Sequence, residues 1–177
     1  MTEMIVSPEQ LALALEMQEE FNKIKISNKF PNRPTDFHGV LGEIMFEQWL
    51  KDLGIEHKWE EFLTTETKDP DFSFKNGSIG LDVKCTRFRK MYWQKVWWDY
   101  YVLIRPIEFE NDDVTKPTKV KIVGWMPKDE LIQAQKEIDA GFTGRGGSEV
   151  RFNKKSYFMY PEKLRPMSEL VEILKNL

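Results

Sequence analysis

The alternation of apolar and polar positions, together with capping residues and turn signals, divides the chain into helices and strands. The first helix has a well-defined start, because Ser7 can cap it, Pro8 suits the first helical position and Gln10 completes a capping box. The other helical segments begin after a capping residue or at a proline, or end at a glycine. We expect four helices, over residues 7–25, 36–54, 127–140 and 166–177.

The strands are expected mainly between the second and third helices, where β-branched and aromatic residues are dense. The expected strand segments are residues 55–62, 71–75, 79–85, 99–109, 119–126 and 155–161. A glycine-rich stretch, residues 141–151, is typical of a mobile loop. The order of elements predicts one α/β (or α+β) domain over residues 1–177, with helices against the faces of a mixed central sheet.

The stretch DPDFSFKNGSIGLDVKC, residues 69–85, predicts a β-hairpin. Asn76-Gly77 between alternating apolar runs favours a two-residue type I′ turn, which sets the register of both strands. Side chains alternate between the two faces of a strand, and in this register one face is wholly apolar. That face consists of Phe72, Phe74, Ile79, Leu81, Val83 and Cys85.

The other face of the hairpin places Asp71 directly opposite Asp82, with Lys84 two residues further along. Like charges in such a pair destabilise a sheet, and local conflicts of this kind tend to mark functional sites. Two carboxylates suit a hard divalent cation such as Mg²⁺ or Mn²⁺. The alternative is a solvated pair of aspartates balanced in part by Lys84. A register slip of one residue would separate the two aspartates.

Pro70-Asp71, followed by Asp82-Val83-Lys84, resembles the PD-(D/E)xK motif of the restriction-endonuclease-like nuclease superfamily. The likeness is greatest to compact viral, phage and Holliday-junction-resolvase-type members. It implies an αβββαβ core with a mixed central sheet flanked by helices, and N- and C-terminal helices added to it.

The extent of this resemblance is roughly residues 36–140. The N-terminal helix at 7–25 and the C-terminal strand and helix at 156–177 would be additions to the core. The chain as a whole is then expected to be one nuclease domain.

The resemblance also implies the chemistry of the site. In similar enzymes, residues at the positions of Asp71, Asp82 and the main-chain carbonyl of Val83 bind Mg²⁺, with Mn²⁺ as a substitute. The lysine stands beside the attacking water or the phosphate, so Lys84 could stabilise charge, position water or deprotonate it. A glutamate on the preceding helix often completes the metal site, and Glu43 has that place in chain order.

Glu43 shares a partly apolar stripe of its predicted helix. Gly39 and Gly42 would let this helix approach the hairpin closely, so that Glu43 could bind the ion or hold one of its waters. The alternative is a boundary residue on a helix with other exposed acids. Glu47, one turn later, is the substitute candidate.

Composition sets outer limits on this hypothesis. The 26 basic and 29 acidic residues give a net charge of −3, which neither requires nor excludes a polyanionic partner. Cys85 is the only cysteine, so a disulfide within the chain is excluded and a cysteine-based zinc site is not expected. His38 and His57 lack a second histidine at ligand spacing, and we interpret both as boundary or capping residues.

The location is expected to be intracellular, in the cytoplasm or, for a viral protein, in the cytoplasm of the host cell. No apolar run approaches the ~20 residues of a membrane span, and the N-terminus lacks the layout of a signal peptide. Neither secretion nor membrane contact is therefore predicted.

Basic and aromatic residues interleave after the motif, a pattern that can serve phosphate contact and base stacking. Trp97 and Trp98 are nevertheless expected in the core, because they lead into a buried strand. The candidate nucleic-acid contacts are Arg87, Arg89, Lys90 and Arg145.

The leading hypothesis is a Mg²⁺-dependent deoxyribonuclease, a phosphodiester hydrolase that acts on nucleic acid, with DNA as the expected substrate. Its predicted catalytic residues are Asp71, Asp82, Lys84 and Glu43. One alternative is a non-catalytic nucleic-acid-binding or assembly module on the same fold. Another is a homo-oligomeric structural protein that uses residues 91–101 as an interface. Because many similar nucleases are dimers, a homodimer is the default expectation.

Overall fold

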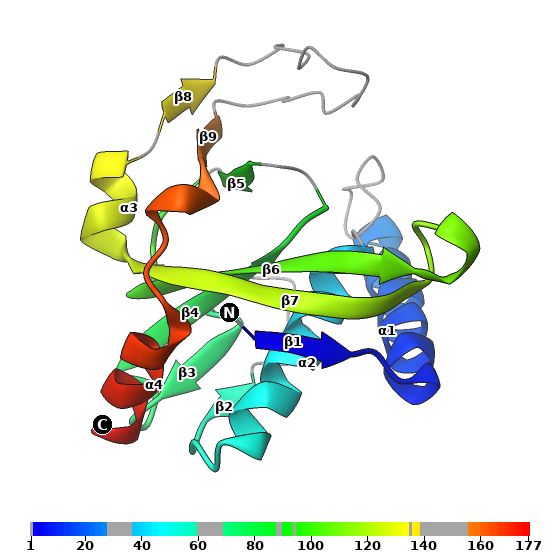
Figure 1. The fold of residues 1–177 in the computed structure, drawn as a ribbon, viewed down its shortest axis with the longest axis horizontal. Coiled ribbons are helices and arrows are strands. Elements are labelled where there is room, and N and C mark those ends of the chain that lie inside the picture. The colour runs from blue at the N-terminus through cyan, green and yellow to red at the C-terminus, as the bar shows by residue number, and fades with distance from the viewer. Residues whose placement is uncertain are drawn as a thin grey trace.

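The computed structural model describes most of the chain, and Figure 1 shows the arrangement of its elements. The described residues are 2–27, 37–59, 69–87, 90–93, 95–134, 136–138 and 156–177. The helices are α1 (Pro8–Ser27), α2 (Phe37–Asp52), α3 (Lys128–Ala134) and α4 (Met167–Lys175), with the short 3-10 helices η1 (Glu110–Asp112) and η2 (Pro161–Lys163). The strands are β1 (Thr2–Ile5), β2 (Lys58–Trp59), β3 (Phe72–Phe74), β4 (Ile79–Cys85), β5 (Met91–Trp93), β6 (Tyr100–Phe109), β7 (Pro117–Pro127), β8 (Lys136–Ile138) and β9 (Ser156–Met159).

The described strands form two sheets in a mixed α/β fold. The larger sheet has six strands in the order β1-β7-β6-β4-β3-β2. It is mixed, because β4 and β6 are parallel and its other neighbouring strands are antiparallel. The smaller sheet has the order β5-β9-β8 and is antiparallel. The chain between the parallel strands β4 and β6 passes through β5, so the smaller sheet is tied to the centre of the larger one.

The two faces of the larger sheet bury different cores. Val102 and Ile104 of β6 pack with α1, α2 and α4 on one face. Tyr101 and Leu103, which alternate with them, pack on the other face with residues of β5, α3 and β9. In Figure 1 the smaller sheet accordingly lies at the top of the view, with α2 and β2 at the bottom. Asp82 and Lys84 of the central strand β4 therefore lie near both packed layers, whereas Glu108 near the end of β6 is exposed.

Several elements match the sequence prediction. The capping box of α1 is present: the N–H of Ser7 donates to Gln10 Oε1 at 2.9 Å, and the N–H of Gln10 donates to Ser7 Oγ at 3.2 Å. The second and fourth predicted helices are found as α2 and α4, and the two long predicted strands as β6 and β7. Local signals suffice for these elements because their apolar periodicity and their end signals agree.

The predicted hairpin register is confirmed within the ladder, whereas the predicted pair of Asp71 opposite Asp82 lies beyond the ladder and is not formed as a strand pair. Phe72 pairs with Leu81, and Phe74 pairs with Ile79. Asn76 and Gly77 have positive φ angles of 55° and 84°, as predicted, but Lys75 also has a φ of 49° and the ladder ends at Phe74 and Ile79. The turn therefore spans residues 75–78 and is longer than the two-residue turn predicted.

Other predictions need correction. The helix expected over 127–140 ends at Ala134, because the chain that follows forms β8 and pairs with β9. Strands β1 and β5 were not expected from sequence, since each is only three or four residues long and depends on pairing with a distant strand. The glycine-rich stretch 141–151 lies outside the described residues. In the part of the chain that is described, no helix has the length and apolar character needed to cross a membrane.

Candidate active site

The predicted motif residues meet at an edge of β4. The β3–β4 ladder begins at the pair Phe72 and Leu81, whereas β4 continues along β6 as far as Cys85. Beyond the ladder, a side chain replaces the neighbouring strand: the carboxylate of Asp71 accepts a hydrogen bond from the N–H of Val83 at 2.6 Å. The confirmed register thus brings Asp71 against the strand that carries the rest of the motif.

The main chain of Val83 faces the same edge. A strand residue directs its N–H and its C=O to the same neighbour, and the N–H of Val83 points to Asp71. The carbonyl oxygen of Val83 therefore lies on the Asp71 side of β4. Its side chain is buried in the core beneath the helices. This geometry is compatible with the predicted role of the carbonyl as a ligand.

Asp82 and Lys84 project from the face of β4 opposite Val83. Their side chains form an ion pair between Asp82 Oδ2 and Lys84 Nζ, and they are 14% and 31% exposed respectively. Asp82 Oδ2 is fully enclosed, and the Lys84 ammonium contacts this same oxygen without good hydrogen-bond geometry. Because a carboxylate oxygen has two lone pairs, it has capacity for a further cation or donor beside Lys84.

Glu43 reaches the same charges from α2. Its side chain is buried, with 3% of the residue exposed. The predicted close approach of α2 is confirmed at Gly42, where a Cβ would lie 2.3 Å from the Cβ of Cys85 on β4. The prediction for Gly39 is wrong, because open space surrounds a Cβ placed there. The close approach of Glu43 to the motif therefore depends on Gly42 and not on Gly39.

Trp59 is a contact of Glu43 that was not predicted from sequence. The indole N–H of Trp59 donates to Glu43 Oε2 at 3.4 Å. Trp59 lies on β2 opposite Phe72 of β3, and their rings stack with centroids 6.2 Å apart. The sequence indicated a short strand at this position, but nothing in it gave the pairing of β2 with β3.

The carboxyl groups of the site perturb one another. Burial, and then the charge of Asp71, raise the pKa of Glu43 well above its usual value, against the hydrogen bond from Trp59. Burial and the charge of Asp82 raise the pKa of Asp71 to about 7, against Lys84 and the N–H of Val83. Three carboxyl groups therefore share one ammonium in a largely enclosed space.

The pKa of Lys84 is shifted in the direction that favours its charged form. Burial alone would lower the pKa of Lys84, but the charges of Asp82 and Asp71 outweigh burial and raise this pKa above its ordinary value. The ammonium therefore remains protonated at neutral pH. Since the single positive charge does not balance three ionised carboxylates, the cluster favours either protonation or an additional cation.

The acidic cluster fits a divalent metal in its chemistry. Carboxylate and carbonyl oxygens are the ligands that Mg²⁺ and Mn²⁺ prefer, and Asp82 offers a buried oxygen without a hydrogen bond of good geometry. Within the described ranges, however, no three His, Cys, Asp or Glu side chains already stand in a metal-ligand arrangement. Lys84 lies against Asp82 instead. Metal binding would thus require side-chain rearrangement.

Glu47, His57 and His38 make contacts outside the acidic cluster. Glu47 pairs with Lys51 at 2.6 Å and lies 3.8 Å from His57. His57 also contacts the carbonyl oxygen of Ile55. His38 contacts the carbonyl of Val114, 3.0 Å away in the β6–β7 connection. These contacts give each residue a structural role, and they favour Glu43 over Glu47 as the helical carboxylate of the site.

The predicted nucleic-acid contacts have mixed outcomes. Arg87 is exposed at the end of β4. The ammonium of Lys90 lies 4.2 Å from the centre of the Phe158 ring and 5.4 Å from that of Tyr160, so it holds β9 as well as facing solvent. Arg89 and Arg145 lie outside the described residues.

The two tryptophans before β6 differ in their surroundings. Trp98 is partly buried and packs with the core that contains Tyr101. A Cβ on Gly80 would lie only 2.8 Å from the Trp98 ring, so the indole covers this glycine of β4. Trp97, in contrast, is 47% exposed, and its predicted burial is wrong. Trp98 packs against Gly80, and the side chain of the adjacent Trp97 points toward solvent.

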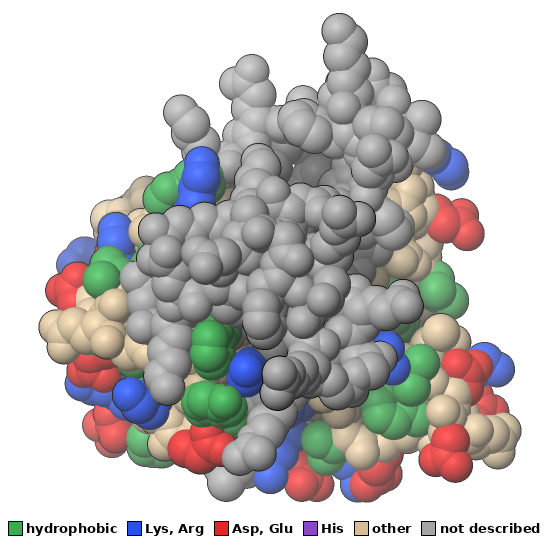
Figure 2. Space-filling model, turned by 90° about the horizontal axis from the view of Figure 1, so that it is seen from above, with side chains coloured by type: hydrophobic (Ala, Val, Ile, Leu, Met, Phe, Trp, Pro, Cys, Tyr) green, Lys and Arg blue, Asp and Glu red, His purple; other side chains and the backbone are tan. Residues whose placement is uncertain are grey.

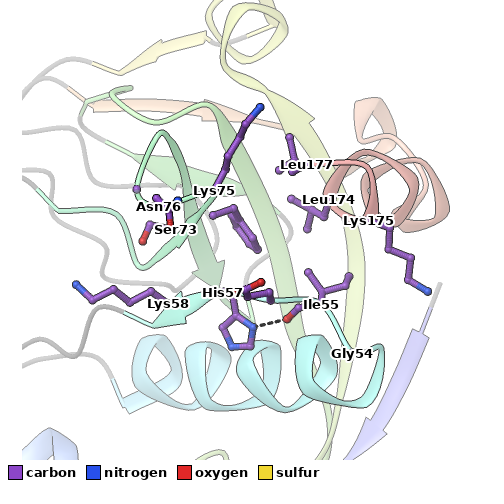
Figure 3. Close-up of a pocket in the computed structure, with 13 residues that line it drawn as sticks. Gly54, Ile55, His57, Lys58, Ser73, Lys75, Asn76, Leu174, Lys175 and Leu177 are labelled. Carbon is purple, nitrogen blue, oxygen red and sulfur yellow. Dashed lines mark hydrogen bonds between the residues drawn. The ribbon is translucent and has the colours of Figure 1, made fainter.

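The cavity shown in Figure 3 is separate from the acidic cluster. It has a volume of about 700 Å³ and lies between the hairpin turn, the segment after α2 and the end of α4. Lys58, Lys75 and Lys175 belong to its lining, but Figure 3 shows them extending outward in different directions. Because no set of its polar groups converges on one point, the motif edge of β4 is the stronger candidate for chemistry.

Comparison with known proteins adds nothing to the nuclease resemblance, which depends on the motif and its geometry alone. A scan against protein-family models finds no model that matches the chain, and a search of curated proteins finds no match.

Proposed function

We propose that this protein is a metal-dependent nuclease that hydrolyses phosphodiester bonds, with DNA as the favoured substrate. The observation that carries the proposal is the meeting of Glu43 with Asp71, Asp82 and Lys84. The helical glutamate is far from the motif in sequence, yet the close contact of Gly42 with Cys85 sets α2 against the motif strand. The charges of Asp71, Lys84 and Asp82 all act on the pKa of Glu43. A buried cluster of this composition is costly for stability alone, which is the signature expected of a functional site.

The order of elements supports the proposal in part. Helix α2, the β3–β4 hairpin and strand β6 follow in the order of the first half of an αβββαβ-type core, with β5 inserted. Strand β7 then precedes α3 as an additional strand, and β8 after α3 belongs to the smaller sheet. The helix carries the glutamate, and the hairpin carries both aspartates and the lysine. We therefore propose a restriction-endonuclease-like core over these elements, with α1 and α4 added.

The residues that would hold the ion are Asp71, Asp82 and the carbonyl of Val83. Glu43 would either bind it or hold one of its waters. A bound Mg²⁺ or Mn²⁺ supplies charge neutralisation at the phosphate and a lowered pKa for coordinated water. The chain would contribute carboxylates from α2, β4 and the residue before β3, and side-chain rearrangement would be required to bring them to one ion.

Lys84 would act through its charge. Its raised pKa keeps the ammonium protonated, which suits stabilisation of developing negative charge and does not suit proton abstraction. If an ion takes its place against Asp82, the ammonium is free to turn toward the phosphate. The surrounding core limits its reach to this face of β4.

The test is cleavage of plasmid and single-stranded DNA in Mg²⁺, in Mn²⁺ and in EDTA. We expect cleavage in either metal, none in EDTA, and none for Asp82→Ala. The matched control is Asp112→Asn, an exposed aspartate in the β6–β7 connection, which should cleave like the unmodified protein. Robust cleavage by Asp82→Ala, or cleavage unaffected by EDTA, would overturn the proposal.

A second candidate function is a non-catalytic nucleic-acid-binding or assembly module. The Asp82–Lys84 ion pair favours it, because such a pair already balances part of the charge without metal. Calorimetric titration with Mn²⁺ separates the two candidates. DNA binding by a folded protein that takes up no Mn²⁺ would support the module and argue against the nuclease.

A further inference from the structure

An aromatic and basic surface lies beside the candidate active site. It consists of Trp97, Lys95 and Lys128, which we call the Trp97 platform. The ammonium of Lys95 lies 4.7 Å from the centre of the Trp97 indole. Lys128 donates a hydrogen bond to the carbonyl oxygen of Trp97 at 3.1 Å. Despite these contacts, 47% of Trp97 is exposed.

Tyr101 holds the main chain of the Trp97 platform in place. Its hydroxyl oxygen accepts hydrogen bonds from the main-chain N–H groups of Trp97, at 2.8 Å, and Trp98, at 3.1 Å. Tyr101 itself is 1% exposed and belongs to the core between the sheets. The main chain that carries the exposed indole is therefore tied to the central strand β6.

A short chain of contacts connects the platform to the acidic cluster. Tyr101 pairs with Asp82 across the parallel strands β6 and β4. Trp98 covers Gly80, two residues before Asp82 on the same face of β4. The rings of Trp98 and Trp97 meet edge to face, with centroids 6.5 Å apart. The indole of Trp97 thus lies to one side of the proposed metal site, on the face that carries Asp82.

We propose that the Trp97 platform binds an unpaired base of the nucleic-acid substrate, so that the preferred substrate contains a single-stranded segment next to the cleaved bond. This inference rests on the proposed nuclease function. An exposed indole presents a π-face on which any base can stack, and stacking of this kind needs a base that is out of the duplex. Lys95 and Lys128 add positive charge for the adjacent phosphates.

The distribution of charge supports a local contact of this kind. Seen from above in Figure 2, basic and acidic side chains are mixed around the rim of the described surface. Where charges of both signs are mixed, an aromatic anchor with two nearby lysines supplies a contact that does not need a broad field of one sign.

The test is the affinity for a fluorescein-labelled single-stranded DNA oligonucleotide, measured by fluorescence anisotropy in EDTA with the full chain. Because no metal is present, binding is measured apart from cleavage. We expect Trp97→Ala to weaken binding about tenfold or more. Trp97→Phe, which keeps an aromatic face, should recover most of that loss. The effect of Trp97→Ala on a fully paired duplex of the same sequence should be much smaller.

Two controls match the substituted groups. Ile132→Ala removes another exposed apolar side chain, on α3, and Lys116→Ala removes a lysine at the opposite end of the β6–β7 pair. Both should bind single-stranded DNA like the unmodified protein. Lys95→Ala and Lys128→Ala should weaken binding and reduce its dependence on salt.

Two outcomes would overturn the platform. One is unchanged single-stranded binding by a folded Trp97→Ala variant, and the other is an equal loss of single-stranded and duplex binding. The nuclease proposal fails separately, through the cleavage test. Trp97-dependent binding without metal-dependent cleavage would support the platform and contradict the nuclease.

Discussion

At the scale of single residues, the ionisation of Asp71 links the stability of the fold to the charge of the site. The carboxyl group is withdrawn from solvent beside Asp82, and its pKa is raised to about 7. Between pH 4 and pH 7 the folded chain therefore holds a proton that the unfolded chain has released. Folding takes up a proton in this window, so the contribution of Asp71 to stability falls as pH rises.

Asp71→Asn tests this linkage. Asparagine can still accept the hydrogen bond from Val83 but carries no charge. In EDTA, the free energy of unfolding of the unmodified protein should fall relative to that of the variant by about 3–4 kcal/mol between pH 4 and pH 7.5. Denaturant unfolding at several pH values measures the difference. Parallel pH curves for the two proteins would contradict a raised pKa, and the control Asp112→Asn should give a parallel curve.

Lys84 offers a second test at this scale. If its ammonium acts through charge, Lys84→Arg should retain more activity than Lys84→Met, because arginine stays protonated. We expect Lys84→Met to lose a factor on the order of 10² to 10³ in kcat. Single-turnover cleavage assays would measure both variants. Equal inactivity of the two folded variants would instead favour proton abstraction by Lys84.

At the scale of elements, the packing of α2 on β4 sets the position of Glu43. Gly42 has no room for a Cβ against Cys85, whereas Gly39, one turn earlier, has open space. Alanine favours a helix over glycine by about 1 kcal/mol at a position with room for it. Substitution of Gly42 by alanine therefore has a matched control in the same helix, the substitution of Gly39 by alanine.

Gly42→Ala should destabilise the protein by about 1–3 kcal/mol, because α2 must move away from β4. It should also reduce metal-dependent cleavage, since Glu43 moves with the helix. Gly39→Ala should leave stability unchanged or raise it, with cleavage intact. Thermal unfolding and the cleavage assay measure both effects. Equal stability of the two variants would show that the close contact at Gly42 does not hold α2.

The elements also show what sequence can predict in this protein. The hairpin register followed from Asn76-Gly77, because few residue pairs accept two positive φ angles and the turn then sets every pair beyond it. Helix α3 was predicted too long, because the pairing of β8 with β9 is a tertiary contact with no local signal. Local chemistry therefore predicted the motif strands better than the smaller sheet.

In the candidate site, too, local signals predicted some residue positions, whereas other positions depend on tertiary packing. The face shared by Asp82 and Lys84 followed from alternation along one strand. The approach of Glu43 was predicted from a helical stripe and two glycines, which are local features, although only Gly42 makes the close contact. Trp59 and the outward position of Trp97 could not be predicted, since they depend on how β2 and the segment before β6 pack against other elements.

At the scale of the whole molecule, a six-stranded sheet lies between a helical layer and a smaller sheet with α3. Its motif strand β4 is central, so the acidic cluster is enclosed by both layers. An enclosed cluster with excess negative charge lowers the stability of the whole fold. A cation that binds only the folded chain should restore that stability.

Thermal unfolding with increasing Mn²⁺ measures this coupling. We expect the Tm to rise, corresponding to about 2.7 kcal/mol when the free ion reaches a hundred times its Kd. Asp82→Asn should abolish the rise while being at least as stable in EDTA, because it removes one of the repelling charges. A Tm that rises equally in Asp82→Asn would place the bound Mn²⁺ elsewhere on the protein.

The most direct measurement of the central claim is a crystal structure of the protein soaked in Mn²⁺, with the ion located by its anomalous scattering. We expect one peak at the edge of β4, bound by carboxylate oxygens of Asp71 and Asp82 and the carbonyl of Val83. Glu43 should contact the ion or one of its waters, and Lys84 should have left Asp82. No peak at this edge, with the Asp82–Lys84 ion pair intact in the soaked crystal, would contradict the proposed metal site and the nuclease mechanism that depends on it.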